Sequence, residues 1–234
     1  MMIEGAIAVK SAIQNKKREI MKVYIDKDKK TKDFNYIRKL IRTLDIPCIE
    51  CDREELNGLL TGKSHGGIGA EVGDRRADPF DDADIFFLDG IEDPFNLGYA
   101  IRTLYALGIK NVLLSKRDYS KMEAQLLKSS AGAYDMISLQ ICEDPVSRIS
   151  GFKEAGYFIY GLYRGEKAKD IFDVTFEDKA LFMLGGEKRG ISSELLELCD
   201  EELYISYGSD FRNALNACAA LDVVVTLLRK QRRL

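Results

Sequence analysis

The sequence has little of several residue types on which common functional sites depend. Its 234 residues include one histidine, five cysteines, four prolines and no tryptophan. The cysteines lie at positions 48, 51, 142, 199 and 218 and form no disulfide framework. Cys48 and Cys51 have the spacing of half a zinc site, but no second pair follows them and a single histidine does not complete one. We therefore expect no metal centre.

Two further absences narrow the class of protein. No run of 18 apolar residues occurs, and the first ten residues are too short and too acidic for a signal peptide, so we expect a cytoplasmic protein. Neither the dinucleotide fingerprint G-x-G-x-x-G nor a P-loop is present. These absences argue against an ordinary doubly wound enzyme that binds a nucleotide, because such an enzyme needs a phosphate-binding loop.

The net charge of −3 conceals an uneven distribution along the chain. Residues 1–42 hold 12 lysines and arginines against 5 acidic residues, whereas residues 43–100 hold 4 against 14. A basic block of this kind is either the solvated face of a helix or a surface that binds the phosphate backbone of a nucleic acid. Composition alone does not choose between them.

The first segment alternates short apolar runs with helical patterns. Strands are predicted at 23–25, 46–50 and 67–72, and helices at 34–44 and 52–60, the second of these capped by Asp52. The stretch 73–84 is polar, contains a proline and has no periodicity, so it is typical of a linker. We predict a small α/β domain over 1–78, a linker over 79–84 and a second domain over 85–234.

The second domain begins with the buried strand "DIFFLDG" and a helix over about 96–107. Further strands are predicted at "NVLLS", "MISLQI", "YFIYGLY" and "ALFMLGG", with helices between them. This alternation predicts an α/β fold with a mostly parallel sheet and helices on both faces. The last helix, over about 213–231, is apolar nearly all round, which predicts burial in its own core or against a second subunit.

Three glycine-marked loops carry the functional signal: "DPFNLGYAIRT" (93–103), "LGGEKRGIS" (184–192) and "ISYGSDFRNALNACA" (205–219). In this order they resemble the three motifs of the SpoU (TrmH-type) family of RNA ribose 2′-O-methyltransferases, in the SPOUT superfamily. "KSSAGAYD" (128–135) looks like the small-residue turn that the family carries between its first two motifs. The first segment, ending "LTGKSHGGIGAEV", is similar to the ribosomal-protein-like RNA-binding module that often precedes this domain.

The resemblance implies a sheet tied in a trefoil knot that holds S-adenosylmethionine. It also implies a homodimer, which agrees with the apolar last helix. The family's cofactor pocket, which recognises adenine largely through backbone groups, corresponds here to Leu184, Gly185, Gly186, Ile205, Leu215 and Asn216.

By the same resemblance the catalytic residues are Asn96, Arg102, Glu187 and Asn216. Asn96 stands at a predicted helix start and is also an N-cap candidate in its own right. Arg102 is the family's proposed general base, yet a guanidinium with a pKa above ~12 is a poor proton acceptor. Either a substrate phosphate perturbs it into that role, or it grips the phosphate while another group takes the proton. We favour the second alternative.

Motif three departs from the family pattern at Ser206, Tyr207 and Ala214. An active RNA 2′-O-methyltransferase is the leading interpretation, with ribosomal RNA preferred over transfer RNA as substrate. A catalytically silent RNA-binding relative is the alternative, supported by Ser206 and Ala214. The basic cluster Lys16, Lys17 and Arg18 is then expected to face RNA.

Overall fold

The protein divides into two compact units in the computed structural model, which describes residues 1–60, 65–186 and 189–232. The first unit joins residues 1–77 to the distant segment 120–136. The second unit comprises residues 78–119 and 137–234. The sequence had placed 120–136 in the second domain, whereas this segment packs with the first unit.

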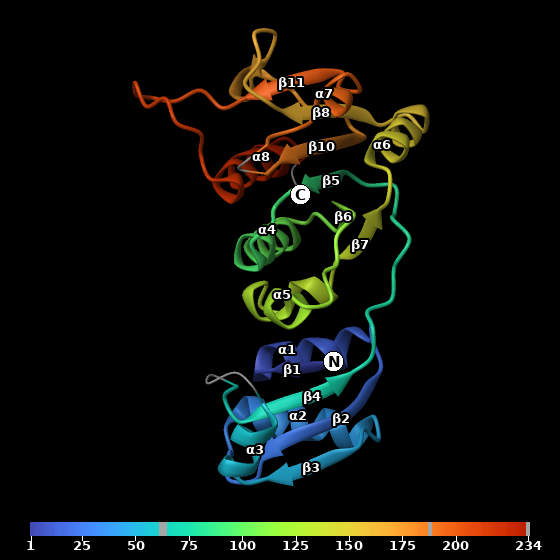
Figure 1. Cartoon of the computed structure of the whole chain (residues 1–234), viewed down its shortest axis with the longest axis vertical. Coiled ribbons are helices and arrows are strands. Elements are labelled where there is room, and N and C mark those ends of the chain that lie inside the picture. Colours follow the sequence, from blue (N-terminus) through green and yellow to red (C-terminus); the bar gives the residue numbers. More distant parts are fainter. Residues whose placement is uncertain (61–64, 187–188, 233–234) are drawn as a thin grey trace. The chain divides into compact units, whose positions relative to one another are not determined.

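The first unit is a four-stranded sheet in the order β1-β4-β2-β3 with helices packed on it (Figure 1). Strand β4 is antiparallel to both of its neighbours, and β3 runs parallel to β2. Neither β1 nor α1 was predicted from the sequence. The elements are β1 (Met2–Glu4), α1 (Ala6–Asn15), β2 (Ile20–Asp26), α2 (Lys32–Thr43), β3 (Cys48–Cys51), α3 (Arg53–Leu59) and β4 (Ile68–Val72).

The segment 120–136 adds α5 (Glu123–Ser129) and the 3-10 turn η1 (Ala133–Asp135) to the first unit, beside α1. The small-residue turn between them fits closely against α1. Gly132 has φ +86°, and a Cβ added there would lie 2.6 Å from the Ser11 Cβ. The Ser11 hydroxyl donates a hydrogen bond of 2.7 Å to the Gly132 carbonyl. Glycine is therefore required at this contact both by conformation and by space.

The second unit is built on a seven-stranded sheet in the order β7-β6-β5-β10-β8-β11-β9, in which every pair is parallel. Its strands are β5 (Ile85–Asp89), β6 (Asn111–Ser115), β7 (Ser138–Cys142), β8 (Phe158–Leu162), β9 (Lys169–Asp170), β10 (Ala180–Gly185) and β11 (Glu201–Tyr204). Its helices are α4 (Pro94–Ala106), α6 (Pro145–Glu154), η2 (Ile171–Asp173), α7 (Ser193–Leu196) and α8 (Ala217–Arg232).

Helices cover both faces of this sheet, as the sequence predicted. On one face Ile149 of α6 and Leu195 of α7 join a buried cluster with alternate residues of the central strands. On the other face Phe86 and Phe182 stack with ring centroids 5.0 Å apart, and α8 packs against both β10 and α4 (Figure 1). The trefoil knot implied by the family resemblance stays a prediction.

The two helices that carry the predicted motifs begin at residues other than those expected. The Asp93 carboxylate caps α4, accepting from the Phe95 and Asn96 amides at 2.9 Å each. Asn96 is therefore not the N-cap and lies in the first turn, after Pro94. Helix α8 starts at Ala217 rather than near 213. Its exposed stripe, which includes Asp222, shows that the helix is amphipathic rather than apolar all round.

Candidate active site

A cavity of about 870 Å³ opens at the carboxyl edge of the sheet in the second unit. Because β5, β6 and β10 are parallel, their carboxyl ends at Asp89, Ser115 and Gly185 meet at one edge. The chain winds outward from β5 through β6 to β7, whereas β10 and β8 lie on the other side of β5. Ligands bind at such a switch point in open α/β sheets. The cavity is lined by Asp89, Gly90, Ile91, Glu92, Asp93, Pro94, Asn96, Arg117, Gly186, Arg189, Gly190, Ser192 and Ala217.

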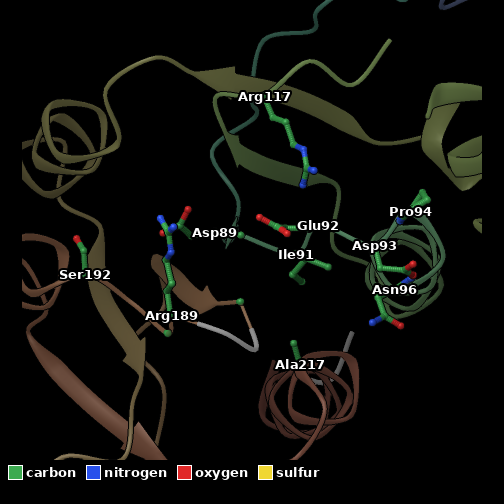
Figure 2. A pocket seen from close by; sticks show the side chains of 13 residues that line it. Asp89, Ile91, Glu92, Asp93, Pro94, Asn96, Arg117, Arg189, Ser192 and Ala217 are labelled. Atoms are coloured by element: carbon green, nitrogen blue, oxygen red, sulfur yellow. The ribbon is translucent and has the colours of Figure 1, made fainter. Parts of the chain in front are cut away.

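Two helix N-termini meet at this cavity, as Figure 2 shows for Asn96 of α4 and Ala217 of α8. The Cys218 thiol donates to the Asn96 carbonyl at 3.1 Å, which joins the first turns of the two helices. The Asn216 side chain accepts from the Cys218 amide at 2.9 Å and so caps α8. At α4 the Phe95 and Asn96 amides are already paired with the Asp93 carboxylate. Of these two N-termini, that of α8 is therefore the better partner for a further negatively charged group.

One wall of the cavity consists of glycine turns in close contact. A Cβ on Gly185 would lie 2.1 Å from the Gly190 carbonyl carbon, and a Cβ on Gly186 would lie 2.2 Å from the Gly90 carbonyl oxygen. Gly90 and Gly190 have φ values of +74° and +64°. No other residue type permits this approach of three backbone segments. The wall therefore offers backbone groups rather than side chains to a ligand.

Charged side chains that were not predicted from the sequence also line the cavity. Arg117 follows β6 and points into the cavity, Arg189 lies beside the glycine turns, and Glu92 lies between them (Figure 2). Arg117 is exposed, two residues beyond the last residue of its strand. The position of Arg117 just after a predicted parallel strand was a usable signal, because strand carboxyl ends share one edge.

Of the residues predicted to bind the cofactor, one is among those that line the cavity. Gly186 lines the cavity, Gly185 ends β10 beside it, and Leu184 is buried in the same strand. Ile205 follows β11 and is half-buried. The exposed Leu215 precedes α8, and its amide donates to the Tyr207 hydroxyl at 3.1 Å.

The remaining predicted catalytic residues do not all gather at the cavity. Asn96 lines it, and Asn216 is adjacent through the cap of α8. Glu187 lies outside the described residues. Arg102 is exposed on α4 and is not among the residues that line the cavity. It shares an outer face of the helix with Phe95 and Tyr99, at spacings of seven and three residues.

The predicted RNA-facing cluster needs a correction at Arg18. Its guanidinium is buried and donates to Asp135 at 2.9 and 3.1 Å and to Glu123 at 3.1 Å. Burial tends to lower the pKa of Arg18, but hydrogen bonds and charge from these carboxylates outweigh burial and raise it. Arg18 therefore holds the segment 120–136 within the first unit and is not available to RNA. Lys16 is exposed and Lys17 half-buried.

Across the described ranges, no helix is both long enough and apolar enough to cross a membrane. The same residues contain no group of three or more His, Cys, Asp or Glu side chains arranged to hold a metal ion.

A parallel sheet with a glycine-walled cavity beside two helix N-termini defines an α/β ligand-binding domain, joined here to a small α/β unit. The model of the SpoU rRNA methylase family matches residues 84–226. A second family model, described as RNA 2′-O ribose methyltransferase substrate binding, matches residues 2–76. The chain belongs to the SpoU rRNA methylase family.

Similar proteins cover nearly the whole chain. The 23S rRNA (guanosine-2′-O-)-methyltransferase RlmB of Xanthomonas campestris is 26% identical over 98% of this chain and 96% of its own. The mitochondrial rRNA methyltransferase 1 of Schizosaccharomyces pombe is 24% identical over 94% of this chain and 87% of its own. The crystal structure of the SpoU methyltransferase AviRb from Streptomyces viridochromogenes in complex with AdoMet superposes with a TM-score of 0.81. At 21% identity it covers 100% of this chain and 90% of that one.

Proposed function

We propose that this chain transfers the methyl group of S-adenosylmethionine to a ribose 2′-hydroxyl of ribosomal RNA in the cytoplasm. The observation that carries the proposal is the cavity at the sheet's carboxyl edge, in a chain of the SpoU rRNA methylase family. Gly186 and Gly190 line this cavity and Gly185 lies beside it. The similar rRNA methyltransferases favour ribosomal over transfer RNA.

The residues around the glycine wall fit S-adenosylmethionine. The close backbone approach at Gly185 and Gly186 leaves carbonyl and amide groups, and no side chains, to contact an adenine or ribose. The loop from Ile205 to Asn216 supplies the other side of this pocket in the proposal. When bound, the cofactor supplies an electrophilic methyl group on a sulfonium. Its carboxylate is a suitable partner for the N-terminus of α8.

The reaction requires the 2′-oxygen to stand in line behind the methyl group, and the hydroxyl proton to leave. Positioning of this kind lowers a barrier by up to ~7–11 kcal/mol. Arg117 and Arg189 line the cavity and suit phosphates on either side of the target ribose. Arg102 is proposed to grip a further phosphate, so that the RNA backbone fixes the 2′-hydroxyl while a separate group accepts its proton.

Replacing Arg102 tests its proposed role directly. We expect Arg102→Ala to bind S-adenosylmethionine as tightly as the parent, because Arg102 lies away from the glycine wall. Methyl transfer should fall at least about 100-fold, because the substrate backbone is no longer held in line. Calorimetry measures cofactor binding, and tritium transfer to ribosomal RNA measures turnover. Arg229→Ala, an exposed arginine in the last turn of α8, is the matched control. Near-normal turnover of Arg102→Ala removes this residue from the mechanism.

One assay on the unmodified protein tests two points: which RNA is the substrate, and whether the chain is instead a catalytically silent RNA-binding relative. Radiolabelled cofactor is incubated with ribosomal RNA and transfer RNA from a strain that lacks the gene. Label in ribosomal RNA alone supports the proposal, and label in transfer RNA alone reassigns the substrate. Binding of the cofactor without transfer to either RNA identifies the catalytically silent relative.

A further inference from the structure

A basic and aromatic surface lies on the outer side of the first unit, where α1 and α2 pack together. Phe34, Ile37 and Ile41 form the buried stripe of α2, so the residues between them face outward. We call this the α1–α2 surface. It consists of Lys10 and Gln14 from α1 and Lys32, Tyr36, Lys39 and Arg42 from α2.

Tyr36 lies at the centre of this surface and is held in place from α1. The Lys10 ammonium lies 5.2 Å from its ring centroid, and the Gln14 amide donates to its hydroxyl at 3.1 Å. The side chain nevertheless keeps 42% of its surface exposed. Among the described residues of the first unit, Tyr36 is the only aromatic ring among the exposed large apolar side chains. A fixed, exposed ring beside a cation is a suitable platform for a stacking base.

The lysines and arginine that α2 contributes to the α1–α2 surface differ in their contacts from two other basic residues of the first unit. Arg38 pairs with Glu50 and donates to the Asp26 carbonyl, and Lys29 donates to the Gly66 carbonyl, so these two serve the fold. Lys32, Lys39 and Arg42 are exposed, and their side chains make no hydrogen bond or ion pair with the described parts of the chain.

These cations follow Tyr36 along one helix face. Lys32 lies four residues before Tyr36 and Lys39 three residues after it, which is an axial rise of about 6 Å and 4.5 Å. Arg42 follows Lys39 after another three residues. The spacing suits successive phosphates of an extended strand. Asp33 is the acidic residue of the exposed side of α2 and lies in its first turn, where a carboxylate is favoured by the helix dipole.

We propose that the α1–α2 surface binds an unpaired segment of the RNA substrate, with one base stacked on Tyr36 and adjacent phosphates paired with Lys39 and Arg42. The inference rests on the proposed function and adds the surface and the form of RNA that it recognises. An unpaired strand fits better than a duplex, because bases inside a helix present no face to a ring. The surface replaces the Lys16–Arg18 cluster as the main RNA contact of this unit.

The test measures binding of the full chain to a fluorescein-labelled 12-nucleotide oligouridine by fluorescence anisotropy. Tyr36→Ala should weaken binding about 5- to 100-fold, because one stacked base is lost. Tyr36→Phe keeps the ring and should bind within a factor of about three of the parent. The matched control is Tyr105→Ala, since Tyr105 is an exposed tyrosine of the second unit with 37% of its surface accessible. Thermal unfolding of each variant verifies that it folds.

The salt dependence of RNA binding tests the contribution of the charged side chains of the α1–α2 surface. For the Lys39→Gln/Arg42→Gln double variant, the slope of log K against log salt should fall by about 1.4, which corresponds to two single-strand phosphate contacts. Equal binding by Tyr36→Ala and the parent, or an unchanged slope, overturns the proposal. So does binding to a 12-base-pair RNA duplex that exceeds binding to the single strand.

Failure of the surface and failure of the proposed function give different results. If the parent binds S-adenosylmethionine and methylates RNA while Tyr36→Ala binds oligouridine normally, the surface alone is wrong. If Tyr36→Ala loses oligouridine binding but the parent shows no cofactor binding, the surface stands and the methyl-transfer proposal fails.

Discussion

At the residue scale, the buried Arg18 guanidinium joins the segment 120–136 to the rest of the first unit. It is buried and pairs with the fully buried Asp135, which lies 117 positions further along the chain. Arg75 lies in the same network, 3.8 Å from Asp135, and donates to the Tyr134 carbonyl. A buried ion pair contributes little net stability when intact, but breaking one partner leaves a buried uncompensated charge.

Asp135→Asn should therefore lower the free energy of unfolding by about 3–5 kcal/mol. Glu50→Gln, which removes the exposed partner of Arg38, should cost less than about 1 kcal/mol. Urea denaturation followed by circular dichroism measures both. Equal losses in the two variants would show that the Arg18–Asp135 pair is no more costly to break than a surface pair.

The burial of Arg18 could not be predicted from the sequence. Lys16, Lys17 and Arg18 form one basic run, and nothing in the run distinguishes a solvated lysine from a buried arginine. The partners of Arg18, the buried Asp135 and the half-buried Glu123, lie more than a hundred residues away. By contrast, Asp93 followed by Pro94 carries a local N-cap and first-turn signal, so the start of α4 was recoverable from the sequence.

At the scale of elements, the loop after β10 depends on glycine for close backbone contact. Gly185 and Gly186 have no room for a Cβ, because Gly190 and Gly90 lie within 2.2 Å of where it would be. Gly151, inside α6, has nothing within 4 Å of the corresponding position. A glycine-to-alanine substitution should therefore be harmful at Gly186 and favourable at Gly151.

Gly186→Ala should displace the turn from Gly90 and weaken S-adenosylmethionine binding at least about tenfold, because backbone groups at the cavity wall move. Gly151→Ala should leave cofactor binding unchanged and stabilise the protein by about 0.5–1 kcal/mol, as expected for an open helical glycine. Isothermal calorimetry and thermal unfolding give the two readouts. Unchanged cofactor affinity in Gly186→Ala would separate this turn from the cofactor site.

At the scale of the whole molecule, the outer face of α4 carries exposed aromatic side chains. Phe95 and Tyr99 have 48% and 50% of their surface exposed and share this face with Arg102. Exposed apolar clusters of this kind mark interaction sites. We propose that two chains form a homodimer through this face, which would place Arg102 at the subunit boundary.

Light scattering at low micromolar concentration should therefore give a mass near twice the 26.4 kDa of one chain. The Phe95→Glu/Tyr99→Glu double variant should give the monomer mass, because two carboxylates are unfavourable in a paired apolar face. Ile7→Glu introduces a charge at another exposed apolar position, 61% accessible, and should leave the mass unchanged. A monomeric parent, or a dimeric double variant, contradicts the proposed interface.

The sequence by itself determined the local properties of this protein. Periodicity located the buried strands β5, β6, β8 and β10, and the three glycine-marked loops identified the family. These signals are readable because each depends on residues a few positions apart.

Tertiary structure alone decided which distant residues meet. It brought Arg117 to the cavity edge, buried Arg18 against Asp135 and joined residues 120–136 to the first unit. It also placed Arg102 on the exposed side of its helix, away from the cavity. Burial and long-range pairing depend on the packing of segments a hundred residues apart. The local sequence pattern of each segment does not show which distant segment it packs against.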